Sequence, residues 1–327
     1  MTTVADTALR DFTEADYERY IEIVNASYPD YGWTVEEIRH EDAGWDDTKH
    51  FRRRLLAEDE ARVVGVADAS HWRNRFQPDH YSVDVVVDPA HRRRGHGRAL
   101  YCRIEGSLRA RDGRLLRSGV KESMSDGVAF ARANGFREIG RDWESRLDVA
   151  AFHETPFLGA YTRIAEQGIT VTTFADERSR DGDGALHKAF ELHEDTRRDV
   201  PAPDPATPGD PELFRRELEG PTALPDAYFI AVGPDGSWLG ESNLWASLVD
   251  PTFLWHGITG VRREARGKGI AMVLKLETIR YAKAHAKREI KTWNATTNRP
   301  MLRINEAVGF VKQPAWIRFE KDLRARR

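Results

Sequence analysis

The chain has 327 residues, of which 40% are hydrophobic and 31% charged, and its formal net charge is −3. This length suits two domains of ordinary size, and the nearly balanced charge gives no indication of a nucleic-acid partner. The single cysteine, Cys102, excludes a disulfide framework and a cysteine-rich zinc site, so we expect no metal centre.

Nothing in the sequence predicts a membrane segment. The first residues, MTTVADTALRDF, lack the apolar core of a signal peptide, and no stretch approaches the ~20 apolar residues that span a bilayer. We therefore expect a cytoplasmic protein with no membrane partner. Because Cys102 falls within a predicted helix, we expect it to be a buried structural thiol.

The first half of the chain predicts strands, a glycine loop and helices in a fixed order. In HYSVDVVVDP (residues 80–89) apolar positions alternate as in a half-buried strand. After the loop RRRGHG (92–97), Leu100, Ile104 and Leu108 fall on one helical face. The other predicted elements of this half are strands at 51–57, 62–69 and 115–121 and a helix at 128–136.

The second half repeats this order. The turn GPDG (233–236) separates two predicted strands, and the strand TFLWHGITGV (252–261) leads into the loop RGKGIA (266–271). The helix that follows turns Met272, Val273, Leu276 and Ile279 inward. The remaining predicted elements are strands at 228–232, 237–244 and 288–294 and a helix at 301–310. We infer a duplication of one α/β unit.

The predicted boundaries place one domain at residues 1–152, a connecting helix or linker at 153–168 and a second domain at 169–327. The stretch PAPDPATPGDP (201–211) is expected to be a surface loop inside the second domain, because proline is excluded from helix and central-strand interiors.

Both glycine loops combine cationic side chains with a strand-to-helix junction. The first backbone N–H groups of a helix lack internal partners, so with the helix dipole they favour an anion, and glycine lets a phosphate approach. A P-loop is excluded because Gly269, and no Ser or Thr, follows Lys268. A dinucleotide fingerprint is excluded because Leu100 and Met272 stand where a third small residue is needed.

The duplicated pattern resembles the GNAT superfamily of acetyl-CoA-dependent N-acetyltransferases, whose signature is Arg/Gln-x-x-Gly-x-Gly/Ala after a strand. Val87 precedes Arg92, and Val261 precedes Arg266, by the same five positions. The resemblance covers nearly the whole chain. It implies an α/β (α+β) fold with two tandem GNAT domains, each a mixed, mostly antiparallel sheet flanked by helices.

The resemblance also implies acetyl-CoA as cosubstrate, transferred to an amine by direct attack without a metal or a covalent intermediate. Its pyrophosphate would meet the loops, and its pantetheine arm the ends of the preceding strands. The implied cofactor-binding residues are Val86, Val87, Arg92, Arg94, Gly95, His96, Gly97, Arg98 and Ala99 in the first copy, and Thr259, Val261, Arg266, Gly267, Lys268, Gly269, Ile270, Ala271 and Asn298 in the second.

The candidate bases depart from the family pattern. The family often carries a glutamate six residues before the strand-end valine, but here Tyr81 and Trp255 occupy these positions. Asp84 and His256 lie nearby and are candidate bases, directly or through water. The alternative is that both are strand residues with local structural roles.

The candidate proton donor also differs. Many members carry Asn-x6-Tyr, and the second copy has Asn298 with Asn305 in the tyrosine slot, where an amide can orient the sulfur. The first copy has Met124 and Ala131 there. We therefore expect the second domain to carry the chemistry, while the first binds CoA weakly or serves as support.

The sequence gives few indications of the acceptor. Segments 28–47 and 193–210 are acidic, which favours a cationic small-molecule amine, although charged surface loops are common. The first hypothesis is an acetyltransferase acting on a small primary amine, and enzymes like mycothiol synthase or antibiotic-modifying acetyltransferases are alternatives. A non-catalytic acetyl-CoA sensor is the alternative from another class. Monomer and homodimer are both open.

Overall fold

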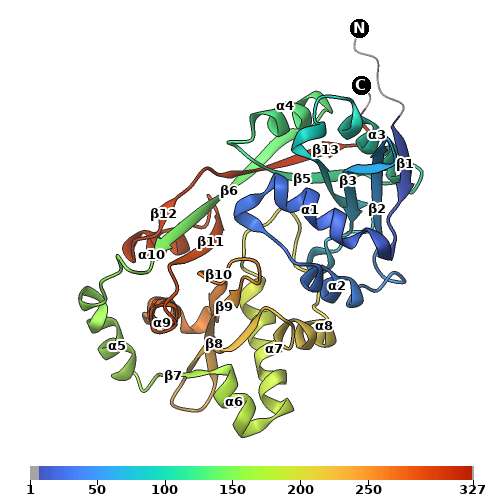
Figure 1. Ribbon diagram of the computed structural model, residues 1–327. Helices are drawn as coiled ribbons and strands as arrows, with labels where there is room; N and C mark the ends of the chain where they lie inside the picture. Colours follow the sequence, from blue (N-terminus) through green and yellow to red (C-terminus); the bar gives the residue numbers. More distant parts are fainter. Residues whose placement is uncertain (1–6, 326–327) are drawn as a thin grey trace. The chain divides into compact units, whose positions relative to one another are not determined.

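A computed structural model describes residues 7–325 and divides the chain into two compact units. The first contains residues up to Arg141 together with the segment from Trp316 onward, and the second contains Asp142–Ala315. Figure 1 shows the course of the chain, and each unit is described by itself.

The first unit is a six-stranded sheet with helices on both faces. Its strand order is β1-β2-β3-β4-β5-β13, with neighbours antiparallel except for the parallel pair β4/β5. The strands are β1 (Ala8–Asp11), β2 (Arg52–Asp59), β3 (Arg62–Ser70), β4 (His80–Val87), β5 (Leu115–Lys121) and β13 (Trp316–Asp322). The helices are α1 (Tyr17–Ser27), α2 (Val35–Ala43), α3 (His96–Arg109) and α4 (Ser125–Ala133), with short 3-10 turns at Glu14–Asp16, Pro29–Tyr31, Arg73–Arg75 and Pro89–His91.

Two apolar layers hold this sheet. Leu100, Ile104 and Leu108 of α3 pack with residues of β2 to β5 and β13 in one core cluster, which also receives α4. On the opposite face, Ile23 of α1 packs against Leu56 and other residues of β2 to β4. The predicted helical stripe of α3 and the alternation along β4 are thereby confirmed.

The second unit repeats the plan. Its strand order is β6-β11-β10-β9-β8-β7, with β12 also paired to β6 and β10/β11 as the parallel pair. The strands are β6 (Arg137–Asp148, in this unit from Asp142), β7 (Thr170–Thr173), β8 (Ala223–Val232), β9 (Trp238–Ala246), β10 (Phe253–Val261), β11 (Glu289–Ala295) and β12 (Val311–Lys312). The helices are α5 (Leu158–Ala165), α6 (Phe174–Asp181), α7 (Asp183–Arg197), α8 (Pro211–Leu218), α9 (Ile270–Ala284) and α10 (Arg299–Ala307), with 3-10 turns at Thr155–Phe157 and Arg263–Ala265.

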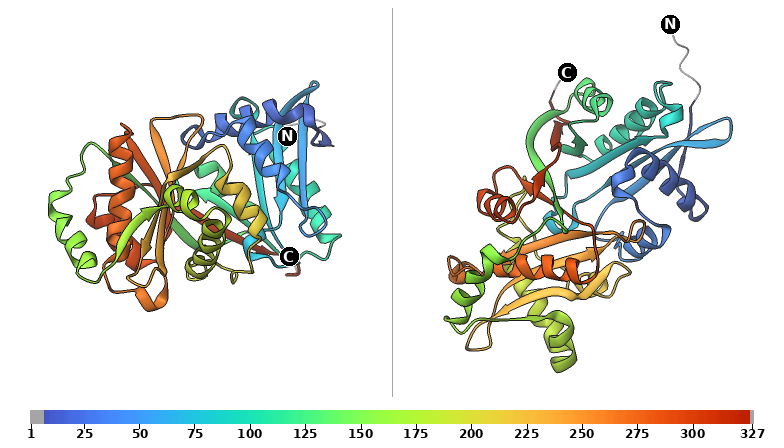
Figure 2. Two further views of the ribbon diagram at one scale, coloured as in Figure 1. Left: turned by 90° about the horizontal axis from the view of Figure 1, so that it is seen from below. Right: turned by 60° about the vertical axis from the view of Figure 1, so that its left-hand side comes forward.

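Helices again cover both faces of this sheet. The α9 residues Val273, Leu276 and Ile279 lie in one core cluster, and Ile164 of α5 joins it. Residues of α6, α7 and α8 form a separate cluster with Tyr228 and Ile230 of β8. Figure 2 shows α9 (orange-red) and α6 and α7 (yellow-green) on opposite sides of the strands. Each unit thus has the expected mixed, mostly antiparallel sheet.

The compact units do not divide where the sequence analysis placed the domain boundary. β13 comes from the end of the chain but pairs along its whole length with β5 of the first unit, from Trp316 opposite Lys121 to Asp322 opposite Leu115. β6 instead pairs with β11 in the second unit. The predicted linker at 153–168 contains α5, whose Ile164 is buried in the core of the second unit.

The proline-rich loop has the predicted structure, whereas Cys102 does not have the predicted burial. Residues 201–210 contain no helix or strand, as predicted for the proline-rich loop, and Pro211 begins α8. The prediction that Cys102 is buried is wrong, because its thiol is exposed. Leu100, Tyr101 and Ile104 form the buried side of α3, which leaves Cys102 on the outer side.

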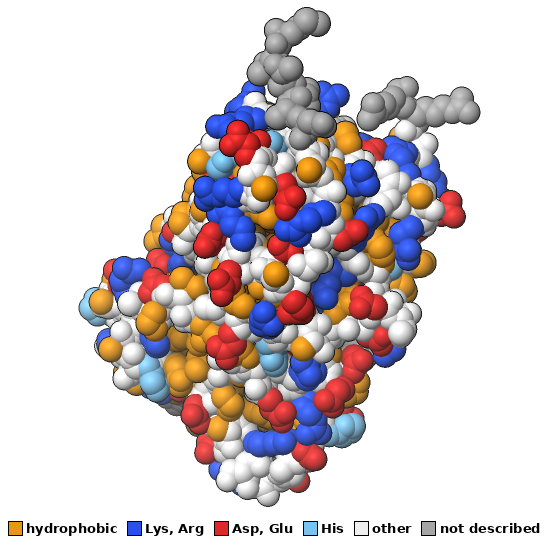
Figure 3. All heavy atoms as spheres, turned by 45° about the vertical axis from the view of Figure 1, so that its right-hand side comes forward, with side chains coloured by type: hydrophobic (Ala, Val, Ile, Leu, Met, Phe, Trp, Pro, Cys, Tyr) orange, Lys and Arg blue, Asp and Glu red, His pale blue; other side chains and the backbone are white. Residues whose placement is uncertain are grey.

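Charge and apolar surface are mixed on the face drawn in Figure 3, where Lys and Arg side chains alternate with Asp and Glu. Within residues 7–325, no helix is long and apolar enough to cross a bilayer.

Candidate functional site

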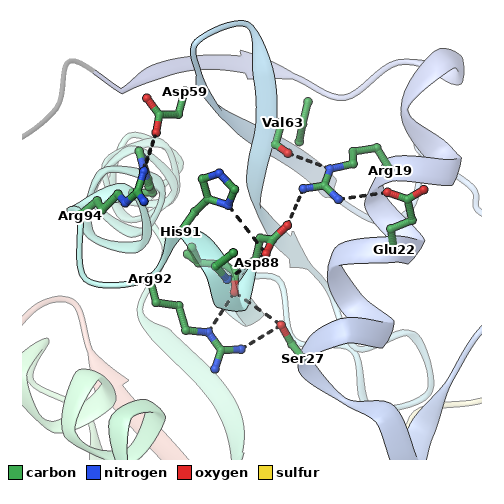
Figure 4. A network of polar contacts seen from close by, with 12 residues as sticks. Arg19, Glu22, Ser27, Asp59, Val63, Asp88, His91, Arg92 and Arg94 are labelled. Atoms are coloured by element: carbon green, nitrogen blue, oxygen red, sulfur yellow. Dashed lines mark hydrogen bonds and ion pairs between the residues drawn. The ribbon is translucent and has the colours of Figure 1, made fainter.

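The arginine that opens each glycine loop braces the loop against the strand before it. Arg92 Nε donates to the carbonyl oxygen of Val87 at 3.0 Å, and its Nη2 donates to Ser27 Oγ at 3.0 Å (Figure 4). Arg266 Nε repeats the contact with Val261 O at 3.0 Å, and its Nη2 pairs with Asp199. These predicted phosphate contacts therefore have internal partners, and the two arginines fix the shape of the loops.

Glycine is required at the start of each helix. Gly95 and Gly269 have φ of 99° and 90°, the left-handed region that strains other residues, and α3 and α9 begin at the next residue. No side chain caps either helix. The first N–H groups of both helices therefore keep their capacity to bind an anion.

The other cationic residues of the first loop differ in their orientation. Arg94 is exposed and lies 3.5 Å from Asp59 (Figure 4), and Arg98 is exposed. His96 turns inward, where its Nδ1 lies 3.0 Å from Thr7 Oγ1 and burial lowers the pKa of its imidazole. Only the backbone of His96 is therefore placed for an anion.

In the second loop, Lys268 is exposed, while the carbonyl of the same residue accepts a hydrogen bond from Gln167 Nε2 at 3.1 Å. Arg163 of α5 lies beside the loop, since a Cβ at Gly269 would come within 3.5 Å of its Cδ. The segment around α5 therefore contributes a cation and a loop contact that sequence motifs did not indicate.

In both units the two parallel strands separate as they approach the loop. β4 pairs with β5 only at His80–Ser82, although β4 continues to Val87. β10 pairs with β11 only at Phe253–Trp255 and continues to Val261. Beyond these points, the strand edge offers backbone groups to a ligand amide. Val86, Val87, Thr259 and Val261 lie in these separated ends.

The strand before the loop is bulged in the second unit. The pairing of β10 with β9 shifts between His256 and Thr259, whereas β4 keeps one register with β3 from Ser82 to Val87. The bulge re-aims the side chains near His256, so the two units differ at the position nearest the strand separation.

Asp84 of β4 lies where the first pair of strands separates. It stands opposite Asp68 of β3, and its side chain reaches solvent. Surrounding protein still strips away much of its hydration, and Asp68 adds repulsion, which together raise the pKa of Asp84 to about 6. Asp68 itself accepts a hydrogen bond from Arg54 Nε at 2.7 Å. Asp84 is therefore an accessible carboxylate that is a stronger base than an ordinary aspartate.

His256, the candidate base of the second unit, lies in the protein interior. Its Nε2 is 2.9 Å from Lys275 Nζ and 3.1 Å from both Ser242 Oγ and Thr259 Oγ1. Burial, with the neighbouring Lys275, holds the pKa of His256 well below its ordinary value. Burial alone lowers the pKa of Lys275 to about 7. His256 is thus a neutral imidazole with its Nε2 in a packed polar cluster.

A second buried cluster occupies the opposite face of that sheet. Glu241 of β9 is fully buried and accepts hydrogen bonds from Thr196 and Tyr228, while His193 Nδ1 lies 3.2 Å away. Burial opposes ionisation of Glu241, but the charge of His193 and these hydrogen bonds outweigh it, so its pKa is lowered. A Cβ at Gly260 would come within 2.4 Å of Thr196, which shows how closely α7 packs here.

The amide pair predicted for the second unit is split between two roles. Asn298 caps α10 by accepting from Met301 N at 3.5 Å. Asn305 is buried, and its Nδ2 donates to Asn294 Oδ1 at 2.7 Å. Asn305 Oδ1 has no hydrogen-bond partner among the described residues. Asn305 therefore retains one acceptor for a ligand.

The corresponding residues of the first unit have structural roles. Met124 stands before α4 and Ala131 is buried in the core.

Aromatic residues occupy the two positions where the family often carries a glutamate. Tyr81 of the first unit stacks on His71, with ring centroids 4.7 Å apart, and Trp255 of the second unit lies against Phe253, with ring centroids 4.6 Å apart. Neither aromatic residue provides a base. The described residues also contain no cluster of three or more His, Cys, Asp or Glu that could hold a metal ion.

Comparison with known proteins agrees with this geometry. The Acetyltransferase (GNAT) family matches residues 17–136, so the first half carries a GNAT acetyltransferase domain. A mycothiol acetyltransferase from Thermomonospora curvata is 28% identical over 268 residues, covering 80% of this chain and 79% of that protein.

Solved structures show the same tandem fold. A tandem GNAT protein from the clavulanic acid biosynthesis pathway superposes with a TM-score of 0.75 at 19% identity, covering 98% of this chain and 100% of the other. A GCN5-related N-acetyltransferase from Sphaerobacter thermophilus has a TM-score of 0.70 at 19% identity, covering 99% and 98%. The likeness extends over both units.

Proposed function

We propose that this chain, which carries a GNAT acetyltransferase domain within a tandem GNAT fold, is an acetyl-CoA-dependent N-acetyltransferase acting on the primary amine of a small molecule. One observation carries the proposal: in both units a glycine-opened, arginine-braced helix start lies next to two parallel strands that separate.

These features fit the two ends of acetyl-CoA. The uncapped N–H groups at the starts of α3 and α9 suit a diphosphate, with Arg94 or Lys268 adding positive charge. The free edges of β4 and β10 suit the amides of the pantetheine arm. The bound cosubstrate supplies a thioester carbonyl that a neutral amine can attack.

The proposal places the chemistry in the first unit. Asp84 reaches solvent beside the strand separation, and with its pKa raised to about 6 it can accept a proton from an ammonium group at neutral pH. This differs from the sequence-based expectation, which favoured the second unit. His256, the candidate there, is buried and bonded to Lys275.

In the second unit, the observations favour binding without turnover. The face that carries Glu241 is filled by α7, and the described acidic and imidazole groups in that cluster are bonded to each other. We propose that this unit binds CoA and supports the first. The hypothesis of a non-catalytic acetyl-CoA sensor therefore applies to the second unit only.

The acceptor we propose is cationic before it loses its proton, because Asp84 and Asp68 face the same side of β3 and β4. A mycothiol-type acceptor is a second candidate, favoured by the relative that matches 80% of the chain. An antibiotic-type amine remains a third.

The experiment is amine-dependent release of free CoA thiol from acetyl-CoA, with Asp84→Asn alongside the wild type. Turnover that depends on an amine and is lost in Asp84→Asn supports the proposal. Acetyl-CoA binding without turnover across a panel of primary amines would make the whole chain a sensor. Turnover that survives in Asp84→Asn would remove the proposed base.

A further inference from the structure

Three aromatic side chains line the first unit near Asp84, and the proposed function does not use them. The ring of Trp316 lies 6.0 Å from that of Tyr28 and 5.4 Å from that of Tyr31, measured between centroids. All three are half-buried. We call Tyr28, Tyr31 and Trp316 the aromatic wall.

The aromatic wall and Asp84 share the α1 face of the sheet. Val83 and Val85, on either side of Asp84, pack into the core cluster under α3, so Asp84 points to the other face. Ile317 joins the same α3-side cluster, which places its neighbour Trp316 on the α1 face too. Tyr28 packs beside Val86 on that face.

The charge of Asp84 acts on Tyr28, one of the three residues of the aromatic wall. Burial and then the charge of Asp84 raise the pKa of Tyr28 to about 12. The two residues therefore belong to one electrostatic environment, and a molecule bound over Asp84 would also meet the ring of Tyr28.

The far end of the wall carries the opposite charge. Lys121 Nζ donates to Tyr31 Oη at 2.5 Å and lies 5.0 Å from the centre of its ring. On β5, Lys121 stands opposite Trp316 of β13. An ammonium group is therefore attracted to the Asp84 end, which orients an amine along the wall.

The segment that supplies Tyr28 and Tyr31 is held in place. Asn25 of α1 binds both backbone groups of Trp33, accepting from its N–H and donating to its carbonyl, each at 2.9 Å. Trp33, in the same segment, is 42% exposed. Tyr28 and Tyr31 thus come from a segment held by hydrogen bonds, and Trp316 comes from a regular strand. A ligand therefore has to order these side chains little on binding, which limits the entropy cost.

We propose that the aromatic wall is the acceptor subsite of the first unit and selects primary amines on a planar apolar body, such as arylalkylamines. The ammonium end lies at Asp84, and the apolar body lies against Tyr28, Tyr31 and Trp316. Trp316 makes β13 part of this subsite. The inference rests on the proposed acetyl transfer in the first unit and names the acceptor class for it.

The test compares phenethylamine with ethanolamine, which carries a primary amine but no ring. We expect kcat/KM at least about tenfold higher for phenethylamine, since an aromatic contact contributes roughly that factor. Trp316→Leu should remove most of this preference and leave the KM for acetyl-CoA unchanged. Trp72→Leu changes a tryptophan that is 43% exposed elsewhere in the chain and serves as the matched control.

A second measurement separates this inference from the proposed function. Calorimetry with phenethylamine in the presence of CoA reports binding whether or not turnover occurs, and Trp316→Phe preserves a ring if Trp316→Leu fails to fold. Binding without turnover, weakened more in Trp316→Leu than in Trp316→Phe and unchanged in Trp72→Leu, would support the subsite and reject the chemistry. Turnover with equal kcat/KM for both amines, or no phenethylamine binding, would overturn the subsite.

Discussion

Lys275 Nζ lies 2.9 Å from His256 Nε2 inside the second unit, and only 1% of Lys275 is exposed. No carboxylate pairs with Lys275 among the described residues, and burial lowers the pKa of its ammonium to about 7. A lysine in this position weakens the folded state when it is charged.

The first prediction concerns this lysine and pH. Its folded pKa is about 7 and its unfolded value is the ordinary 10.5, so between these pH values the unfolded chain binds more protons. The cost is therefore full below pH 7 and shrinks as the pH rises towards 10.5. Lys275→Met should stabilise the protein by about 3–5 kcal/mol at pH 6 and much less at pH 9.5.

Urea unfolding of wild type and Lys275→Met at both pH values measures this difference. The exposed Lys283 of the same helix gives a matched control, because Lys283→Met should shift stability little at either pH. An equal effect of Lys275→Met at pH 6 and 9.5 would show that the lysine is not forced to be neutral.

The second prediction concerns the pH profile of catalysis. Since the pKa of Asp84 is about 6, kcat/KM should fall about tenfold per pH unit below 6 as the base becomes protonated. Asp84→Asn should lower kcat/KM about 10²–10⁴-fold and abolish this limb. Two amines of different basicity should share the limb near pH 6, and exposed Asp126→Asn should leave it in place. If the midpoint of the acidic limb shifts with the basicity of the amine, the limb reports ionisation of the substrate and contradicts the role of Asp84.

The third prediction separates the two phosphate loops. Gly97 and Ala271 are equivalent second residues of α3 and α9, and glutamate at either position places a carboxylate where the diphosphate is proposed to bind. Each change should remove CoA binding at its own unit, seen by calorimetry as about one site in place of about two. Glutamate is tolerated at helix starts, so folding should be preserved.

The same pair assigns the chemistry. Gly97→Glu should abolish turnover, while Ala271→Glu should retain most of it. Gly269→Glu is a less suitable variant, because Gly269 has φ of 90° and a glutamate there would strain the loop itself. Loss of turnover in Ala271→Glu alone would return the chemistry to the second unit.

The fourth prediction concerns the contact between β13 and α3. Lys321 Nζ donates to Glu105 Oε2 at 2.7 Å and to Tyr101 Oη at 2.8 Å in the interior of the first unit. Burial opposes ionisation of Glu105, but hydrogen bonds from Lys321, Tyr101 and Arg109 prevail and lower its pKa to about 2. Lys321→Met should therefore cost about 1.5–3 kcal/mol of stability, because Glu105 and Tyr101 lose a buried charged donor while Arg109 still pairs with Glu105.

The exposed pair of Lys312 and Glu306, 2.6 Å apart, provides the control. Lys312→Met should change the free energy of unfolding by at most about 1 kcal/mol. Thermal unfolding of both variants measures the contrast, and equal losses would contradict the role given to burial.

The sequence predicts most of the fold because its signals are local. The alternation around Val83, the helical spacing of Leu100 and Ile104 and the turn at Gly236 each depend on neighbours in the chain, and each appears in the structure. Duplication of these signals predicts the tandem fold. The pairing of β13 with β5 and of β6 with β11 joins segments that are distant in the sequence. Hydrophobic periodicity, which is a local signal, does not encode such pairing.

The candidate site was only partly predictable for a related reason. The glycines at 95 and 269 carry a backbone requirement that can be recognised in the sequence. Whether His256 and Asp84 reach solvent depends on tertiary packing. Lys275 interrupts the apolar run of α9 between Leu274 and Leu276, and that interruption was the one sequence signal for a buried polar cluster.

Because β13 supplies the sixth strand of the first unit, that unit stays incomplete during synthesis until residues 316–322 have left the ribosome. Cutting the gene at residue 152 would leave β5 as a bare sheet edge in one fragment and β13 without its neighbour in the other. Co-expressing the two fragments could restore the missing pairing, so complementation in trans is the natural way to dissect this protein.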